Sequence, residues 1–279
     1  MIGAGINVGR WRDALFERLV DGVTRHVPLR RLPHANVTAA PLPDPDVVDI
    51  VTVAFENADV IGWQQELLAR NLRDPYRHTV VDNSPTADAR ARIRAATQRY
   101  GTGYVDISVL TRRFAGGSMS HGIALNWAWY RLLRPRGAEF AAFLDHDVLP
   151  IAPTSLREEV GSAGVFGLVQ PRPDRWYLWA GLSCFRRDVL VGRRVDFRPE
   201  PGVTDTGGRN WGPVFSRVDR EALHVPPHRY GHLRPGDDPQ SDYFEMIGDW
   251  LHVINASRWK PAAGRDELVA ELVGRYLRD

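Results

Sequence analysis

Two carboxylates one residue apart, Asp145 and Asp147, are the side chains of this sequence whose types and spacing point most clearly to chemistry. They follow an apolar run at 140–144, whose length and composition predict a buried strand. Open α/β sheets bind ligands outside the carboxyl ends of their strands. Oxygen ligands there suit Mg²⁺ or Mn²⁺, which are commonly shared with substrate phosphates. The pair predicts a nucleotide-diphosphate site, and the alternative is a strand followed by an Asp-rich turn.

The elements that must position this pair alternate between strand and helix. Expected strands in the first half are 47–55, 77–81, 103–109 and 140–144. The helices expected between them are 59–71, 86–100 and about 117–133. This alternation predicts an α/β fold with a mainly parallel central sheet and helices on both faces.

The rest of the chain is less regular. Residues 1–46 predict an N-terminal arm, an amphipathic helix at 11–27 followed by a Pro-rich linker. Beyond residue 150 we expect a loop at 199–212 and a closing helix at 266–277. The strands expected there are 165–170, 177–185, 223–225 and 251–254.

Composition narrows the function classes. The chain has 279 residues, 43% hydrophobic and 25% charged, which is typical of a globular protein with a sizeable core. A net charge of +2 without a basic, aromatic-interleaved stripe gives nucleic-acid binding no support. Cys184 is the single cysteine, so no intrachain disulfide forms. We see neither a signal peptide nor a transmembrane run and expect a cytoplasmic protein.

Four segments, in order, resemble the nucleotide-sugar half of GT-A glycosyltransferases, especially family-2 (rhamnosyltransferase-like) members. They are TVAFEN at 52–57, VVDNS at 80–84, FAGGSMSHGIA at 114–124 and FLDHDV at 143–148. The resemblance covers 47–150 and implies a GT-A-like, Rossmann-like fold. It also implies a metal-dependent transferase that moves a sugar from a nucleotide-diphosphate sugar to the hydroxyl of a small molecule or glycan. A homo-oligomer is compatible with this expectation.

Donor-binding residues are expected at the ends of the first strands. Phe55 and Asn57 can frame a nucleobase, and Asp82 can accept a hydrogen bond from a base N–H, as the matching Asp does in the family. The alternative for Asp82 is a turn-forming role. The pair Gly116 and Gly117 lets the backbone approach a ligand closely where a helix begins. The alternative is an ordinary helix start with a capping residue and no ligand. By the resemblance, four residues lie near the ribose and diphosphate: Gly116, Gly117, Ser120 and His121.

The resemblance also implies which residues of this sequence bind the metal. The resemblance implies that Asp147 coordinates Mn²⁺ or Mg²⁺, and that Asp145 touches the ribose or the metal. Many GT-A enzymes return a late His to the metal, and His252 is the best placed; its alternative is a structural hydrogen bond. His146, where the family often has a small residue, either reaches the metal or donor sugar or faces solvent.

The acceptor side is expected in 151–279, after a donor half at 47–150 and the arm at 1–46. An inverting transferase needs a carboxylate base. Asp205, on a Gly-rich loop, is the first candidate and Asp242 the reserve. Trp179 and its neighbours either stack on a sugar or pack the sheet.

Two other functions are alternatives to glycosyl transfer. A sugar-phosphate nucleotidyltransferase would carry a Gly-rich, cationic loop after the first strand, and 55–59 has neither glycine nor cation. A non-catalytic nucleotide-sugar-binding module stays open. His224, His228 and His232 have zinc-like spacing, but Pro226 and Pro227 prevent the helix that would align them.

Overall fold

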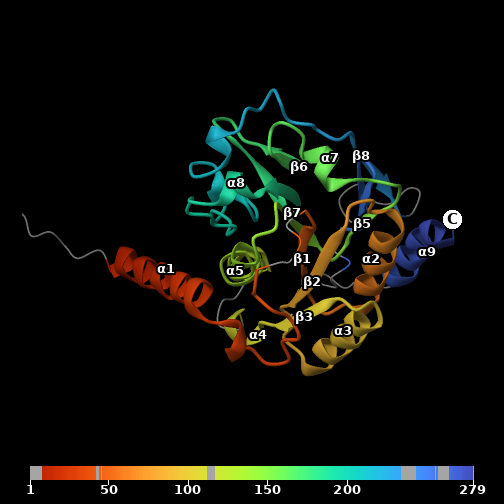
Figure 1. Cartoon of the computed structure of the whole chain (residues 1–279), viewed down its shortest axis with the longest axis horizontal. Coiled ribbons are helices and arrows are strands. Elements are labelled where there is room, and N and C mark those ends of the chain that lie inside the picture. The colour runs from red at the N-terminus through yellow and green to blue at the C-terminus, as the bar shows by residue number, and fades with distance from the viewer. Residues whose placement is uncertain are drawn as a thin grey trace, which may run out of the picture.

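The fold is built around a six-stranded sheet in the order β3-β2-β1-β4-β7-β6 (Figure 1). The computed structural model describes residues 8–41, 44, 46–111, 117–233, 243–254, 256 and 264–278. The strands are β1 (Val48–Ala54), β2 (Tyr76–Asp82), β3 (Gly103–Asp106), β4 (Phe140–Asp145), β6 (Val165–Pro171) and β7 (Trp176–Arg186). The first four run parallel, β7 pairs antiparallel with β4, and β6 pairs antiparallel with β7 at the edge of the sheet. The predicted α/β class with a mainly parallel sheet is confirmed.

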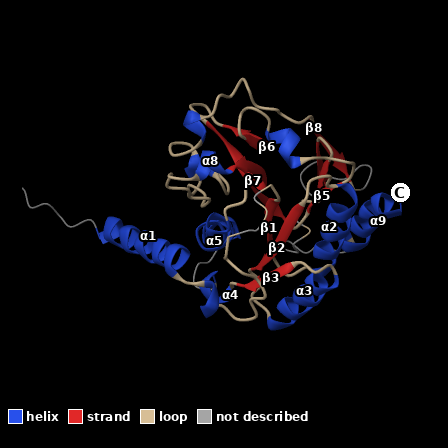
Figure 2. Ribbon diagram, in the orientation of Figure 1, coloured by secondary structure: helices blue, strands red, loops and turns tan. Residues whose placement is uncertain are grey.

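Helices cover both faces of this sheet (Figure 2). Val80 of β2 packs with Ile61 and Ile93 from two helices on one face, whereas Val81 packs in the cluster of a third helix on the other. This is the alternation of side chains that a strand imposes. The longer helices are α1 (Val8–His26), α2 (Ala58–Asn71), α3 (Ala87–Arg99), α5 (Gly117–Ala128) and α9 (Arg265–Arg278). Shorter ones are α4 (Ser108–Thr111), α6 (Arg134–Arg136), α7 (Leu156–Val160) and α8 (Arg187–Leu190).

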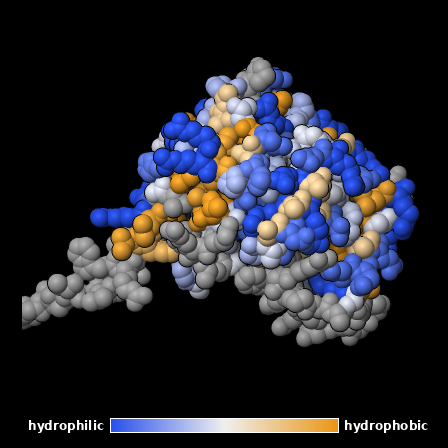
Figure 3. Space-filling model, turned by 90° about the horizontal axis from the view of Figure 1, so that it is seen from below, coloured by the Kyte–Doolittle hydropathy of each residue, from blue (hydrophilic) through white to orange (hydrophobic). Residues whose placement is uncertain are grey.

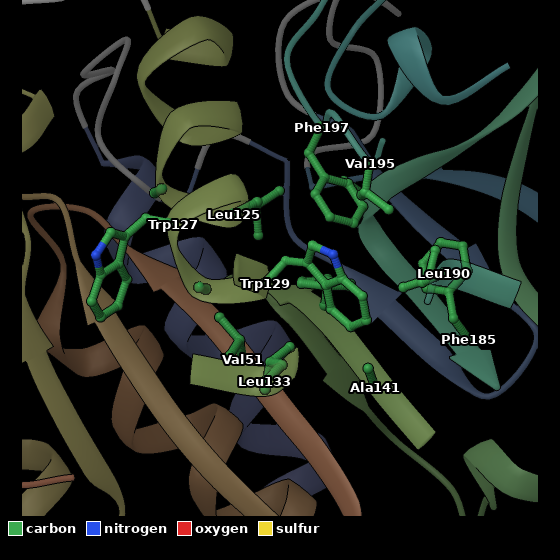
Figure 4. Close-up of a cluster of buried hydrophobic side chains, with 14 of the residues drawn as sticks. Val51, Leu125, Trp127, Trp129, Leu133, Ala141, Phe185, Leu190, Val195 and Phe197 are labelled. Atoms are coloured by element: carbon green, nitrogen blue, oxygen red, sulfur yellow. The ribbon is translucent and has the colours of Figure 1, made fainter. Parts of the chain in front are cut away.

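The larger core cluster lies between α5 and the sheet. Trp127 and Trp129 are buried at 0% and 1% exposure, and Figure 4 shows them projecting to different sides of the helix. Trp129 points toward Phe197, whose ring lies 4.5 Å from that of Phe143 on β4. A π-helical turn at Trp129–Leu133 continues α5. Buried aromatic area of this kind fixes α5 and its π-helical continuation against the sheet whose strand β4 ends at Asp145.

A second, four-stranded antiparallel sheet has the order β5-β10-β9-β8. Its strands are β5 (Val148–Pro150), β10 (Trp250–His252), β9 (Tyr243–Ile247) and β8 (His228–His232). β5 begins directly after Asp147, so this sheet brings the C-terminal part of the chain to the end of β4. Of these strands, the sequence predicted β10 and missed the other three.

Two predicted elements were wrong in detail. No regular structure covers 223–225, and β8 begins at His228, beyond the two prolines that cannot donate ladder hydrogen bonds. The strand expected at 103–109 ends at Asp106, because the Asp106 side chain accepts a hydrogen bond from Ser108 N at 2.9 Å and starts α4.

The N-terminal arm contacts the rest of the protein through ion pairs between acidic side chains of α1 and a buried arginine. Glu17 and Asp21 of α1 lie 2.9 and 3.5 Å from Arg198, which is only 2% exposed. Leu15 and Leu19 are about 60% and 57% exposed, and Figure 3 shows hydrophobic residues at the surface where the arm meets the body. None of the described helices has the length and hydropathy needed to cross a membrane.

Candidate active site

The two carboxylates lie at the point where the strand order reverses. The chain places β2 and β3 on one side of β1 and then returns to set β4 on the other. Asp145 is the last residue of β4 and is in register with Val53 of β1. In open α/β sheets the ligand crevice lies at this reversal, outside the carboxyl ends of the strands. The topology therefore places Asp145 and Asp147 at the position where this fold class binds ligands.

Gln64 of α2 holds the turn between β4 and β5. Its Nε2 donates to the carbonyl oxygens of Asp145 and Val148 at 2.8 and 2.9 Å, and its Oε1 accepts from Thr52 Oγ1 at 2.8 Å. Gln64 is fully buried. A buried amide with all these partners resists rotation, so Gln64 fixes the backbone of the turn that carries Asp145 and Asp147.

His146 points into the protein. Its Nδ1 lies 3.2 Å from the carbonyl oxygen of Val53, and the residue is 5% exposed. The solvent-facing alternative for His146 is therefore wrong. Since the carbonyl can only accept, Nδ1 carries the proton in this contact.

His121 of α5 pairs with Asp145. His121 Nε2 lies 3.0 Å from Asp145 Oδ1, with both side chains largely buried. Burial by itself lowers the pKa of His121, but the carboxylates of Asp145, Asp205 and Asp147 outweigh burial and raise that pKa. Burial likewise raises the pKa of Asp145, and the neighbouring imidazoles outweigh it and lower that pKa. Each partner therefore favours the charged form of the other at the carboxyl end of β4.

A chain of polar contacts leads from Asp147 into the second sheet. His252 Nε2 lies 3.7 Å from Asp147 Oδ1, and His252 Nδ1 lies 2.6 Å from Glu245 Oε2. The other Glu245 oxygen lies 3.5 Å from His228 Nε2. Glu245 and His252 are cross-strand partners on β9 and β10, so the sheet register sets their contact. The Trp179 ring, 4.7 Å from the His252 ring, covers this imidazole.

The donor set suits a divalent cation. A His that binds a metal through one nitrogen usually bonds a carboxylate through the other, as His252 does with Glu245. The 3.7 Å between His252 Nε2 and Asp147 Oδ1 exceeds a hydrogen bond and is compatible with two donors to one ion. Oxygen donors with one imidazole match Mn²⁺ or Mg²⁺. Across the described residues, no three His, Cys, Asp or Glu side chains are placed to hold a metal ion together, and Asp145 contacts His121 instead of joining Asp147 and His252.

Asp205 lies on a loop that packs against β7. Its backbone N donates to Tyr177 Oη at 2.9 Å, and its Oδ1 accepts from Thr206 N at 2.7 Å. Gly207 has φ of 97°, and a side chain there would approach the Leu178 carbonyl oxygen to 2.4 Å, so this turn requires glycine. The carboxylate is exposed and acts electrostatically on His121. The fold thus brings Asp205 to the same end of the sheet as Asp145.

The residues expected to bind the donor have internal hydrogen bonds. Asp82 is fully buried, and its two oxygens accept from Ser84 N and Tyr104 Oη, both at 2.8 Å. Asn57 caps α2 and donates to the Ala256 carbonyl at 2.8 Å. These contacts match the turn-forming alternative for Asp82, and its contact with a nucleobase stays a prediction.

The remaining candidates are placed as follows. Gly117 is the first residue of α5, and Ser120 Oγ accepts from Asn83 Nδ2 at 3.2 Å, which joins α5 to the end of β2. Phe55 is half-buried at the end of β1. Gly116 and Asp242 lie outside the described residues.

Three positions at the candidate site were not singled out from the sequence. Gln64 and Glu245 act through contacts with residues distant in the chain, for which no local pattern exists. Glu56 has φ of 60°, a left-handed conformation that non-glycine residues rarely adopt and that concentrates at functional sites. Its backbone N donates to Ser84 Oγ at 2.8 Å, so the turn after β1 is held in this strained form beside the reversal point.

Comparisons with known proteins yield distant structural likenesses. No family model and no curated protein matches the sequence. A mannosyltransferase, PcManGT from Pyrobaculum calidifontis, solved with GDP-Man and Mn²⁺, is 18% identical with a TM-score of 0.37. The bifunctional glycosyltransferase WbbM, solved in its apo form, is 16% identical with a TM-score of 0.36. The matches cover 65% and 53% of this chain, but 55% and 33% of those proteins, and they assign no activity to it.

Proposed function

We propose that this protein is a metal-dependent glycosyltransferase that uses a nucleotide-diphosphate sugar. The observation that carries the proposal is the pairing of Asp147 with the Glu245-supported His252 at the carboxyl end of β4, where the strand order reverses. A carboxylate at a ligand crevice is the usual protein ligand of a cation that is shared with substrate phosphates, and His252 would add one nitrogen donor.

The proposed roles follow from the charges. Asp147 and His252 would hold Mn²⁺ or Mg²⁺, and Asp145 would join them as a third donor only on turning away from His121. Bound there, the ion would neutralise the charge that develops on the departing diphosphate. His121, whose pKa the nearby carboxylates raise, lies beside Asp145 and would add a positive charge on the same side when protonated. These groups favour cleavage of the bond between the anomeric carbon and the phosphate oxygen.

Asp205 is proposed as the base of an inverting reaction. Its carboxylate takes the proton of the acceptor hydroxyl while that oxygen bonds to the anomeric carbon. Its exposure leaves room for an acceptor, and the Thr206 N–H fixes one of its oxygens. Asp242 remains the reserve candidate.

A binding experiment tests this proposal. Thermal shifts are measured with UDP-, GDP- and dTDP-sugars, each with and without Mn²⁺, on the wild type, Asp147→Asn and the control Asp249→Asn. Asp249 is an exposed carboxylate in the turn between β9 and β10. We expect a Mn²⁺-dependent rise in Tm with one nucleotide, lost in Asp147→Asn and kept in the control.

Two outcomes contradict the proposal. No shift with any nucleotide sugar would remove the donor assignment. A shift accompanied by neither sugar transfer to a mixed acceptor panel nor hydrolysis of the donor would instead indicate a non-catalytic nucleotide-sugar-binding module.

A further inference from the structure

Three aromatic side chains lie close together on the second sheet, and we call His228, Tyr230 and Tyr243 the aromatic patch. The ring centroids of His228 and Tyr230 are 4.7 Å apart, and those of Tyr230 and Tyr243 are 5.6 Å apart. Tyr230 is 62% exposed, the largest exposed fraction among the described large hydrophobic side chains. Neighbouring exposed rings form a continuous surface, in contrast to the single hydrophobic residues that are normal on any protein. The aromatic patch is therefore a candidate binding surface.

The register of the strands connects the aromatic patch to the candidate metal site. Tyr230 on β8 lies opposite Glu245 on β9, and Glu245 lies opposite His252 on β10. Directly opposite residues project from the same face of an antiparallel sheet, so these three side chains form a row across it. Since neighbouring strands are about 4.8 Å apart, Tyr230 lies about 10 Å from His252 along this row. The patch is therefore beside the metal site without being part of it.

The opposite face of the same strands is the one that packs on the protein. Phe244, next to Glu245 in the chain, packs against the apolar cluster that includes Leu251. A side chain on Gly231 would come within 2.2 Å of the Phe244 ring, so glycine at this position lets that ring lie against β8. Because side chains alternate between the two faces of a strand, Tyr230 projects away from this cluster. Its ring is therefore not needed to fill the core.

The chemistry of the aromatic patch suits a sugar ring. The rings of His228 and Tyr243 are tilted from that of Tyr230 by 48° and 59°, so neither lies flat on it. The C–H groups of a sugar pack on an aromatic face, and its hydroxyls bond to polar groups at the ring edge. Burial and the Glu245 carboxylate raise the pKa of Tyr230, so its hydroxyl stays protonated and can donate a hydrogen bond. A saccharide can therefore use both the face and the edge of Tyr230.

We propose that the aromatic patch binds a sugar ring of the acceptor, stacked on Tyr230 beside the candidate metal site. The acceptor of the reaction is then a saccharide, and one of its hydroxyls attacks the anomeric carbon of the donor. Its role as an acceptor subsite rests on the proposed glycosyl transfer, whereas saccharide binding by the patch does not.

Fluorine magnetic resonance of the full chain tests saccharide binding. The protein is labelled with 3-fluorotyrosine, and the Tyr230 resonance is identified by its loss in Tyr230→Phe. Methyl α- and β-glycosides of glucose, mannose, galactose and rhamnose, and short oligosaccharides built from them, are titrated into the labelled protein. We expect a saturable shift of the Tyr230 resonance with at least one saccharide. In saturation-transfer measurements on that saccharide, Tyr230→Ala should weaken binding at least about tenfold, since the stacking face is lost.

Matched variants and a kinetic measurement complete the test. Tyr230→Phe keeps the aromatic face and should bind the saccharide nearly as well as the wild type. Tyr100→Ala removes another exposed ring, at the end of α3, and should leave binding unchanged. With the same saccharide as acceptor, Tyr230→Ala should raise the acceptor KM about tenfold. Its Tm shift with the nucleotide sugar and Mn²⁺ should match that of the wild type, because Tyr230 does not contact the donor.

The proposal is overturned if no saccharide shifts the Tyr230 resonance, or if Tyr230→Ala binds the saccharide with unchanged affinity. It is also overturned if uridine, and no saccharide, loses affinity in Tyr230→Ala, because the patch then stacks a base. Failure of the proposed function gives a different result, in which no nucleotide sugar raises Tm. Saccharide binding at Tyr230 in that case would support the binding site and overturn its role as an acceptor subsite.

Discussion

At the scale of single residues, Glu245 links the second sheet to His252 of the candidate metal site. Burial raises the pKa of Glu245, but its contacts with His252 and His228 outweigh burial and lower that pKa, so it is a carboxylate. A carboxylate on Nδ1 fixes the ring orientation and directs Nε2 toward Asp147. Glu245 is a positioning residue in this arrangement.

We expect Glu245→Ala to weaken Mn²⁺ binding by about 10- to 100-fold, the usual effect of losing an outer carboxylate of a metal-binding His. Titration calorimetry of Mn²⁺ into the purified protein measures this without relying on turnover. Glu267→Ala, an exposed position on α9, is the control. Equal Mn²⁺ affinity in the wild type and Glu245→Ala would show that His252 needs no such support.

Asp205→Asn tests the base. Asparagine keeps an acceptor for Thr206 N, so the loop should stay in place while the proton acceptor is lost. We expect transfer to slow by about 10²- to 10⁴-fold with donor affinity unchanged. Single-turnover transfer and donor binding are compared with Asp174→Asn, a largely exposed carboxylate on the neighbouring turn. Full activity in Asp205→Asn would eliminate it as the base.

At the scale of elements, α2 and the β4–β5 turn are joined by one buried side chain. Gln64→Leu would leave the Asp145 and Val148 carbonyls without their amide donor. We expect the free energy of unfolding to fall by about 1–3 kcal/mol. Urea denaturation measures this fall.

Gln65→Leu provides a control one position along the same helix. Because its amide has no partner among the described residues, replacement by an apolar group should leave stability unchanged or raise it. An equal fall in the free energy of unfolding of both variants would mean that any substitution on this part of α2 destabilises the protein. The hydrogen bonds of Gln64 to the β4–β5 turn would then not be the cause.

Gly181 shows how a strand makes room for an aromatic cover. A side chain on Gly181 would come within 2.1 Å of the Trp179 ring, so β7 needs glycine there for this ring to lie beside His252. Glycine is therefore needed at position 181 to leave space for the Trp179 ring, and not to form a turn.

At the scale of the whole molecule, burial of ionisable groups couples stability to pH. Burial lowers the pKa of His78 to about 3. Between that value and the ordinary 6.5, the unfolded chain binds the proton and the folded protein does not. Stability therefore rises with pH through this window and is lost as pH falls.

We expect His78→Gln to reduce this dependence by up to about 1.4 kcal/mol per pH unit below 6.5. Burial raises the pKa of Asp49 to about 6, despite Arg136, which gives the opposite slope in part of the window. The difference between wild type and variant isolates His78, and urea unfolding from pH 4 to 7 measures it. Parallel curves for the two proteins would mean that His78 is protonated in the folded state.

Much of the fold could be predicted from local pattern. The apolar run at 140–144 forms β4, and the strand and helix alternation over 47–144 forms the parallel part of the sheet. These elements follow from side-chain periodicity, which is a property of neighbouring residues. β5, β8 and β9 lack such a signal, because they are short and their pairing partners lie far along the chain.

The same distinction divides the candidate site. Asp145 and Asp147 are placed by the strand that precedes them, so residue types and spacing suffice to bring them to the end of a sheet. The contacts of His121, Glu245 and Gln64, and the solitary amide of Gln65, arise from the packing of distant elements. A sequence pattern reports which face of a helix or strand is apolar, but a hydrogen bond also depends on which element packs there and in which register. That selection is made by the complete set of tertiary contacts.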